Sequence, residues 1–286
     1  MNKLLCVIGP TATGKTQKAI ELSLLQPSIL ISADSRQVYR GMDIVTGKDH
    51  PKNLELYGID LVDPDESCSV SVWYDAVMPR ITQAWREGKL PIVVGGTGLY
   101  VKALTEGIDT MQVPINQPLR DELGPLSITE LQDKLIKLDN SKFEIMNHSD
   151  QSNPRRLSRA IEIASYNQSD RQLPSQSIRE LPQNVNIIGL KYSVESIQRN
   201  KIKSRVISRL KLGAIEETKN LLTRYDKNIQ SMSAIGYTSI IKYLENTITK
   251  EELIKQWVAG ELSYAKRQMT WFRKQSVIWY DVDNNI

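Results

Sequence analysis

The octapeptide "GPTATGKT", residues 9–16, has the residue types and spacing of a loop that binds phosphate groups. It follows the apolar run "KLLCVI" and precedes a stretch of helical character, which is the context that the G-x-x-x-x-G-K-[ST] spacing requires. Backbone amides of residues 11–16 are expected to point at phosphate oxygens, Lys15 to neutralise them, and the Thr16 hydroxyl to suit Mg²⁺. The residues predicted to bind phosphate are Gly9, Pro10, Thr11, Ala12, Thr13, Gly14, Lys15 and Thr16.

A second residue that could do chemistry is Asp34, at the end of the apolar run "SILISAD". At the carboxyl end of a neighbouring parallel strand, its carboxylate would face the phosphate site. The residues alone leave three roles open: a ligand of Mg²⁺, a general base for an incoming nucleophile, or the N-cap of a helix. The loop alone would indicate ATP or GTP, so the identity of the bound phosphates also stays open at this point.

These side chains need a parallel sheet to bring them together. Short apolar runs at 4–10, 28–34, 90–96 and 184–190 are typical of buried strands, and 276–282 is a candidate for a short final strand. Helical spacing at 16–25 and 70–88 alternates with the first three runs. In the second of these helices one face is predicted to hold Val72, Ala76, Val77, Ile81 and Ala84. The pattern predicts an α/β fold, a parallel sheet flanked by helices.

The pattern changes after residue 110. Residues 111–183 have helical pieces, few strand-like runs and several prolines, and we interpret them as a helical insertion into a core made of residues 1–110 and 184–286. The polar stretch 166–183 is predicted to be a mobile loop. The C-terminal part is mostly helical, with a long helix at about 195–224 and another at 249–275, where Thr249 and Glu252 suit a capping box.

Composition limits the class of protein. The chain has 286 residues, 40% of them apolar, and no apolar stretch approaches the ~20 residues that cross a bilayer, so we expect a cytoplasmic protein without a membrane partner. Two cysteines, Cys6 and Cys68, cannot build a disulfide framework or a four-ligand zinc site, so we expect both to be reduced thiols. Residues 1–150 carry 15 Lys/Arg against 20 Asp/Glu, whereas residues 151–286 carry 22 against 13. The basic half favours a polyanionic partner, although solvated helix faces give the same count.

Six sequence blocks together resemble those of the tRNA dimethylallyltransferases, also called tRNA isopentenyltransferases, in order and approximate spacing. The resemblance extends from about residue 3 to residue 280, and the blocks that contain Asp34 and Thr97 are more specific than the phosphate loop. The absence of a eukaryotic-type zinc finger from this sequence favours the bacterial type. The blocks are "GPTATGKT", "SADSRQVYRGMDIVTGK", "VVGGTGLYVKAL", "RRLSRAIEI", "AIGY" and "YAKRQMTWFRK".

The resemblance implies a P-loop NTPase-like fold in which the loop binds the diphosphate of dimethylallyl diphosphate instead of a nucleoside triphosphate. The implied reaction moves the dimethylallyl group to the exocyclic N6 amine of the adenosine on the 3′ side of the anticodon in tRNA and releases diphosphate. The implied cofactor is Mg²⁺, with Thr16 as its ligand, and the implied partner is the anticodon stem-loop. We expect the protein to be a monomer.

By resemblance, the catalytic residues are Asp34 as proton acceptor, Arg205 beside the leaving diphosphate, and Thr97 near the reacting groups. On residue type alone, Thr97 is equally well a helix N-cap. Arg156 could be a surface cation, and the aromatic residues of the last block could simply pack in the core. The residues that the resemblance places at the tRNA are Asp34, Ser35, Arg36, Gln37, Thr97, Arg120, Arg155, Arg156, Leu157, Ser158, Arg159, Lys266 and Arg267.

The chain also departs from the family pattern. The family commonly has "GMDIGTAK" where this chain has "GMDIVTGK", which changes positions Val45 and Gly47. The usual "HPND" is here "DQSN", and Thr238 stands where the family has a basic residue. The first change is expected to alter closure of the loop, and the second leaves the contacts of the insertion open.

Three other functions fit parts of the sequence. An adenylate isopentenyltransferase would prenylate free AMP, ADP or ATP, but it would need neither the insertion nor the basic C-terminal half. A P-loop kinase of small metabolites would bind a nucleoside triphosphate tightly. An RNA-binding module without catalysis would have no use for Lys15, Thr16 and Asp34 together.

Overall fold

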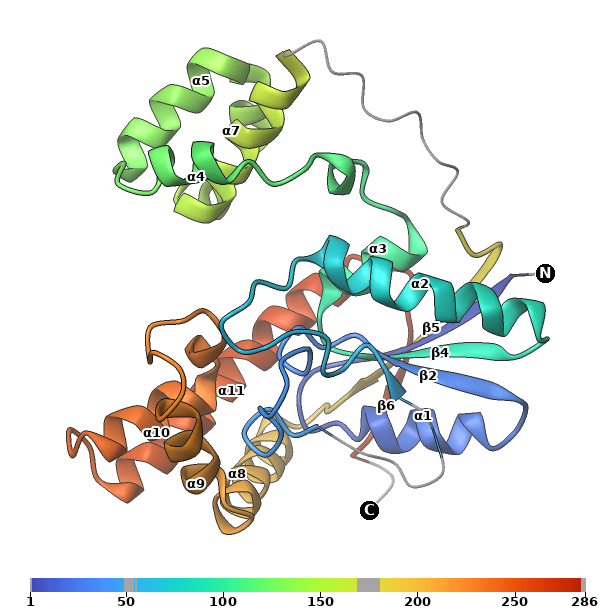
Figure 1. Ribbon diagram of the computed structural model, residues 1–286. Helices are drawn as coiled ribbons and strands as arrows, with labels where there is room; N and C mark the ends of the chain where they lie inside the picture. Colours follow the sequence, from blue (N-terminus) through green and yellow to red (C-terminus); the bar gives the residue numbers. More distant parts are fainter. Residues whose placement is uncertain (1, 49–53, 55, 169–180, 284–286) are drawn as a thin grey trace. The chain divides into compact units, whose positions relative to one another are not determined.

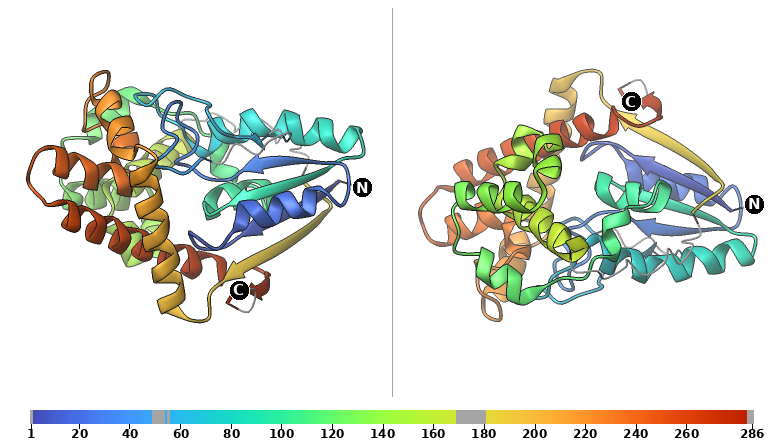
Figure 2. Two further views of the ribbon diagram at one scale, coloured as in Figure 1. Left: turned by 90° about the horizontal axis from the view of Figure 1, so that it is seen from below. Right: turned by 90° about the horizontal axis from the view of Figure 1, so that it is seen from above.

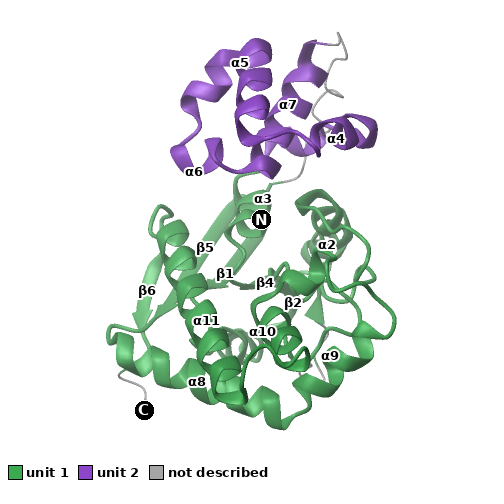
Figure 3. Ribbon diagram, turned by 90° about the vertical axis from the view of Figure 1, so that its left-hand side faces the viewer, with its two compact units in different colours: residues 1–107, 181–286 green, residues 108–180 purple. Residues whose placement is uncertain are grey.

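The computed structural model describes residues 2–48, 54, 56–168 and 181–283. The chain divides into two compact units, one formed by residues 1–107 and 181–286 and the other by residues 108–180 (Figure 3). In chain order the elements are β1 (Lys3–Ile8), α1 (Lys15–Ser23), β2 (Ser28–Ser32), β3 (Leu56–Tyr57), α2 (Val70–Arg86), β4 (Leu90–Gly95), α3 (Gly98–Thr105), α4 (Gln117–Leu123), α5 (Ile128–Ile145), α6 (His148–Gln151), α7 (Pro154–Gln168), β5 (Asn184–Lys191), α8 (Glu195–Lys211), α9 (Ala214–Leu222), α10 (Ile235–Leu244), α11 (Lys250–Phe272) and β6 (Ile278–Asp281), with short 3₁₀ turns at Asp109–Gln112 and Ser231–Ser233.

The larger unit is built on a six-stranded sheet of order β3-β2-β4-β1-β5-β6, in which every pairing is parallel (Figure 1). The predicted parallel sheet flanked by helices is therefore confirmed, with β3 as a two-residue strand that the sequence pattern did not predict. One expectation is wrong. The strand before Asp34 is not next to β1, because β4 lies between β1 and β2. Loops that follow β1, β2, β4 and β5 still meet at one edge of the sheet.

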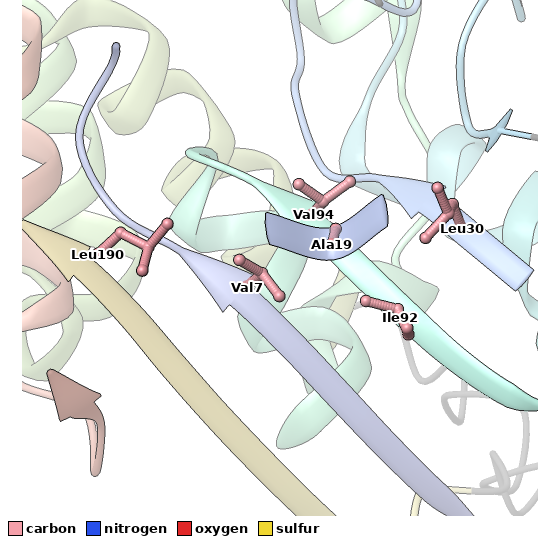
Figure 4. Packing of buried hydrophobic residues seen from close by; sticks show 6 residues of the cluster. All are labelled: Val7, Ala19, Leu30, Ile92, Val94 and Leu190. Carbon is pink, nitrogen blue, oxygen red and sulfur yellow. The ribbon is translucent and has the colours of Figure 1, made fainter. Parts of the chain in front are cut away.

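The core of this unit forms because alternate strand residues face opposite sides of the sheet. Val7, Ile92 and Val94 pack against α1, where the small side chain of Ala19 lets the helix approach closely (Figure 4). Helices α1 and α2 cover opposite faces of the sheet (Figure 2). On the second face, Cys6 is fully buried, and both cysteines are free thiols as predicted.

The inward face of helix α2 is the predicted one in part. Val77, Ile81 and Ala84 are buried as predicted, but Val72 and Ala76 are exposed and Trp73 lies in the core instead. The indole of Trp73 stacks on Tyr100 at 4.2 Å between ring centroids and donates to the carbonyl of Ser32 at 3.0 Å. The large aromatic ring therefore decides the orientation of the helix over smaller apolar residues.

The C-terminal helices differ from the prediction in one respect. The single long helix expected at about 195–224 is two helices, α8 and α9, which are separated at Gly213 because its φ of +104° is left-handed. Helix α11 begins at the predicted capping box, since the side chains of Thr249 and Glu252 each accept from the other's backbone amide. Helices α8, α10 and α11 lie at the carboxyl end of the sheet within the larger unit (Figure 1).

The smaller unit is all-helical in the residues described. Leu123 of α4, Leu131 and Leu135 of α5, and Leu157 and Ile161 of α7 form its apolar core. Helix α5 starts at a second capping box, Ser127 with Glu130. The stretch predicted to be a mobile loop falls largely on residues 169–180, which lie outside the described residues. In the described parts of the chain, every helix is too short or too polar to span a bilayer.

Candidate active site

The phosphate loop connects β1 to α1 at the centre of the sheet edge. Gly9 has φ +144°, and a Cβ there would lie 2.2 Å from the carbonyl oxygen of Leu190 on the neighbouring strand, so only glycine fits. Gly14 has φ +79° and caps α1, whose first turn carries Lys15 and Thr16. The geometry is that of an anion site at a helix N-terminus.

Contacts from distant elements hold the loop in shape. Ala12 is left-handed with φ +66°, and its carbonyl accepts a hydrogen bond of 2.8 Å from the Tyr192 hydroxyl at the end of β5. The amide of Thr11 donates to Oε1 of Gln268 on α11 at 3.0 Å. The Nζ of Lys15 donates to the carbonyl of Pro10 at 2.7 Å. The Thr11 amide is thus engaged by α11, whereas the sequence placed it among the amides directed at phosphate.

A cavity of about 750 Å³ opens over this loop. Ten of the residues that were predicted as site residues line it. Among its other lining residues are four with charged or phenolic side chains that were not predicted as site residues, Lys201, Arg209, Glu261 and Tyr264. Gly9, Pro10, Thr13, Ser35, Thr97 and Lys266 are not part of its lining. The ten predicted residues are Thr11, Ala12, Gly14, Lys15, Thr16, Asp34, Arg36, Gln37, Arg205 and Arg267.

Cations gather on one side of the cavity. Lys201, Arg205 and Arg209 lie four residues apart on α8, so their side chains share one helix face. Arg209 is buried, pairs with Glu261 at 3.4 Å and donates to the carbonyl of Thr46 at 3.2 Å. Spacing of four residues around the predicted Arg205 was the signal that could have identified the other two cations.

The departure at Gly47 fits these arginines. Gly47 has φ +66°, and a Cβ there would lie 2.0 Å from Nη2 of Arg209 and 2.7 Å from Nη2 of Arg205. Val45, the other changed residue, is buried and occupies the space beside Gly236. The changed loop is therefore packed against α8 and α10.

Asp34 follows β2 and is partly buried at the cavity wall. Its Oδ1 accepts from the amide of Arg36 at 2.9 Å, and residues 35–38 form a turn in which the amide of Gln37 donates to the carbonyl of Asp34. No helix begins here, so the N-cap alternative is wrong. The side chain of Gln37 ties the loop together by accepting from Ser32 Oγ and donating to the carbonyl of Gly47.

Thr97 occupies the N-cap position of α3, but its side chain makes no capping hydrogen bond. Instead, Oγ1 accepts from the Ser35 amide at 3.0 Å and lies 3.3 Å from Ser35 Oγ. The hydroxyl of Tyr264 pairs with the Thr97 side chain, and burial, reinforced by the nearby Asp34 carboxylate, raises the pKa of Tyr264 to about 12. Thr97, Tyr264 and Asp34 thus form one polar group beside the cavity.

The two predicted cations of α11 are exposed. Lys266 pairs with Glu195 at 3.4 Å, and the Arg267 guanidinium lies 5.6 Å from the ring centroid of Tyr264. Phe272 is fully buried, and Trp271 packs on Gly98 while remaining 39% exposed. The interpretation that these aromatic residues pack in the core is correct for Phe272, whereas Trp271 contacts Gly98 but stays exposed.

In the smaller unit, the predicted tRNA residues have different environments. Arg120 and Arg159 both bind the buried carboxylate of Glu162, with Nη2 of Arg120 at 3.0 Å. Burial raises the pKa of Glu162, but hydrogen bonds from Arg120, the Asn116 amide and Arg159 outweigh it and leave the pKa lowered. These two arginines therefore have a structural role, whatever else they bind.

The remaining residues of that segment divide by exposure. Leu157 has no exposed surface, so its predicted contact with tRNA is wrong, and it is a core residue of the smaller unit. Arg155 and Arg156 are exposed at the start of α7, where Arg156 pairs with Asp150. Ser158 is partly buried.

The oxygen-bearing side chains near the phosphate loop fit a Mg²⁺ ion whose other ligands are water and the oxygens of a bound phosphate compound. In the described ranges, no group of three or more His, Cys, Asp or Glu side chains is placed to hold a metal ion. The Thr16 hydroxyl and the Asp34 carboxylate line the same cavity. Because Mg²⁺ in phosphate sites keeps several waters and binds phosphate oxygens with one or two protein ligands, the Thr16 hydroxyl fits as its protein ligand.

Comparison with known proteins agrees with this geometry. Residues 37–275 match the model of the family described as IPP transferase, and residues 2–62 match that of isopentenyl transferase. A tRNA dimethylallyltransferase of Bacillus mycoides is 36% identical over 98% of this chain and 90% of its own.

Two solved structures are also similar. A full-length tRNA isopentenylpyrophosphate transferase of Bacillus halodurans superposes with a TM-score of 0.71 and 35% identity, covering 99% of this chain and 90% of that one. A tRNA isopentenylpyrophosphate transferase of Staphylococcus epidermidis superposes with a TM-score of 0.69 and 30% identity, covering 99% of this chain and 94% of that one. With a family model that matches most of its length and relatives that it covers almost completely, the chain belongs to the IPP transferase family.

Proposed function

We propose that this protein transfers the dimethylallyl group of dimethylallyl diphosphate to the exocyclic N6 amine of the adenosine on the 3′ side of the anticodon in tRNA. One observation supports this most: the phosphate loop, Asp34 and Arg205 line a single cavity. That cavity combines an anion cradle with a carboxylate, which is the pairing that a prenyl transfer to an amine requires. Membership of the IPP transferase family agrees with it.

The loop and α8 would stabilise the leaving group. As the C1–O bond of the donor breaks, the bonding electrons move to the diphosphate, whose added charge would be met by Lys15, Arg205 and the N-terminus of α1. Mg²⁺, held by Thr16 and the diphosphate oxygens, would supply further charge neutralisation. The Lys15 ammonium group, which donates a hydrogen bond to the Pro10 carbonyl in this structure, would turn to the diphosphate when the donor binds.

Asp34 would take the proton. As the N6–C1 bond forms, the amine nitrogen becomes positively charged and must lose a proton. The Asp34 carboxylate, which lines the cavity beside Tyr264, would accept it. The turn at 35–38 fixes one carboxylate oxygen through the Arg36 amide, so the other oxygen can accept the proton.

The tRNA would be bound by both units. An adenine in a loop has to leave its stack to reach a carboxylate in a cavity, which costs less in a single-stranded loop than in a duplex. We assign Arg36, Lys266 and Arg267 in the larger unit and the exposed Arg155 and Arg156 in the smaller one to the RNA backbone. A substrate of this kind implies a cytoplasmic enzyme.

A labelling experiment tests the proposal. The protein is incubated with Mg²⁺ and dimethylallyl diphosphate that carries radiolabel in the prenyl group, with unmodified tRNA in one reaction and AMP in another. Label in tRNA, mapped by nuclease digestion to the adenosine beside the anticodon, is the expected result. Label in AMP alone would indicate an adenylate isopentenyltransferase, and ATP turnover without label would indicate a kinase.

A further inference from the structure

Helix α11 carries three polar side chains on one face, and two of them line the cavity. Glu261, Tyr264 and Gln268 follow the i, i+3, i+7 spacing that aligns residues along a helix. Glu261 pairs with Arg209, and Tyr264 pairs with Thr97. Gln268, in contrast, reaches two loops at once.

Gln268 connects the phosphate loop to the loop that precedes Thr97. Its Oε1 accepts from the Thr11 amide at 3.0 Å, and its Nε2 donates to the carbonyl of Gly96 at 3.1 Å. The side chain is buried, with 6% of the residue exposed, so these bonds do not compete with bulk water. Both ends of the amide are used, and no other residue type of this length both accepts and donates.

The surroundings are shaped for this contact. A Cβ at Gly96 would lie 1.9 Å from Nε2 of Gln268, so glycine is needed for the approach. Thr11 lies after β1 and Gly96 after β4, and these strands are paired, with Ile8 opposite Gly95. The two loops therefore start side by side, and Gln268 sets the separation of their tips from a helix that is fixed by its own capping box and buried residues.

We propose that Gln268 is a positioning residue: it aligns the loop that holds the diphosphate with the loop that holds Thr97, so that donor and acceptor meet at reacting distance. The inference rests on the proposed function. Gln268 reaches the reacting groups only through Thr11 and Gly96. Misalignment of the two loops lowers the rate of the chemical step, because transfer needs the donor carbon and the amine in near-attack geometry.

Two variants separate the two hydrogen bonds. Gln268→Met keeps the length of the side chain and removes both bonds, and we expect kcat for tRNA prenylation to fall about 100-fold, the usual effect of a displacement near 1 Å. The KM for tRNA should stay unchanged. Gln268→Glu keeps the acceptor for Thr11 but sets a carboxylate against the Gly96 carbonyl and close to the diphosphate, so the KM for dimethylallyl diphosphate should rise as well. Gln256→Met, at an exposed position of the same helix, is the matched control.

A readout that does not depend on prenylation keeps the test separate from the proposed function. The affinity for inorganic pyrophosphate, measured by titration calorimetry, should fall about tenfold in Gln268→Met, because the loop is no longer held ready for the anion. If wild-type protein fails to label tRNA, the proposed function falls, and the pyrophosphate comparison still tests the role of Gln268. Wild-type kcat and pyrophosphate affinity in Gln268→Met would overturn the inference, and so would a loss of activity that is fully explained by a smaller folded fraction in thermal unfolding.

Discussion

At the scale of single residues, a turn holds Asp34 at the cavity wall. The bond from the Arg36 amide to Oδ1 is local, two residues along the chain, and it would persist with any side chain that keeps an oxygen at this position. The carboxylate charge and its shape can therefore be tested separately. Substitution by asparagine removes the negative charge and keeps the shape of the side chain.

For Asp34→Asn, we expect kcat to fall by a factor of about 10²–10⁴, the range attributed to general acid–base catalysis, because an amide cannot accept the proton of the amine. The KM for dimethylallyl diphosphate should change little, since the turn and the phosphate loop remain. Steady-state kinetics with tRNA as acceptor measures both constants. Near-normal turnover in this variant would show that Asp34 is not the proton acceptor.

Tyr264 has a consequence for stability at alkaline pH. Its folded-state pKa of about 12 exceeds that of an exposed tyrosine, near 10, because burial disfavours the phenolate. The unfolded chain therefore releases this proton first, and the stabilisation, fully present below about pH 10, is lost as pH rises toward 12.

For Tyr264→Phe, we expect the decline in the free energy of unfolding between about pH 9 and 11 to be smaller than in wild type by about 1 kcal/mol. Urea titrations at several pH values provide the measurement. Equal slopes in the two proteins would show that the hydroxyl is not buried against Thr97 and Asp34.

At the scale of elements, the segment 43–48 is held from outside. The carboxylate of Glu217 on α9 accepts from the amides of Asp43, Ile44 and Val45 at 2.9, 2.6 and 3.1 Å and from the Tyr237 hydroxyl at 2.6 Å. Lys48, whose side chain is fully buried, closes the segment by pairing with Asp43 at 2.7 Å. The Glu217 side chain thus accepts the hydrogen bonds of three backbone amides that would be bonded to backbone carbonyls in a helix or strand.

Glu217→Gln should lower the free energy of unfolding by about 1–3 kcal/mol, because a neutral amide accepts more weakly and its own N–H groups face amide donors. Urea denaturation monitored by circular dichroism tests this. Glu216→Gln, at the neighbouring exposed position, is the control and should unfold like wild type. A shift of the same size in both variants would mean that the four hydrogen bonds contribute nothing specific.

Elements also show what the sequence could predict. The phosphate loop, the strands and the capping box of α11 depend on neighbours within a few residues, and the pattern predicted them. The partners of Gln268 lie 257 and 172 positions away, and that of Glu217 at Asp43 lies 174 positions away. Nothing in the local spacing of a glutamine or glutamate identifies such partners, so these residues were missed. Leu157 was misassigned because its neighbours in the motif are exposed arginines, whereas its own helix position faces the core.

At the scale of the whole molecule, the smaller unit has a basic end that can be tested without disturbing its core. Arg155 and Arg156 are exposed, whereas Arg120 and Arg159 hold Glu162. Only the exposed pair can be removed without leaving a buried carboxylate unpaired.

In the double variant Arg155→Ala, Arg156→Ala, we expect weaker tRNA binding and a slope of log affinity against log salt that is smaller by roughly one for each phosphate that is no longer neutralised. The melting temperature should not change. Arg86→Ala, an exposed arginine of α2, serves as the control. Filter binding at several salt concentrations gives the slope, and an unchanged slope would place the RNA elsewhere.

The pairing of β1 with β5 joins residues 3–8 to residues 184–189. A ribosome that adds about 5–20 residues per second needs roughly 10–35 s to make the intervening chain, so β1 waits for its partner while the helical unit emerges. Tyr192 and Gln268, which shape the phosphate loop, are made later still. The phosphate loop therefore lacks two of its supporting contacts until α11 has been made, and we expect a chain that is truncated before α11 to be inactive in prenyl transfer.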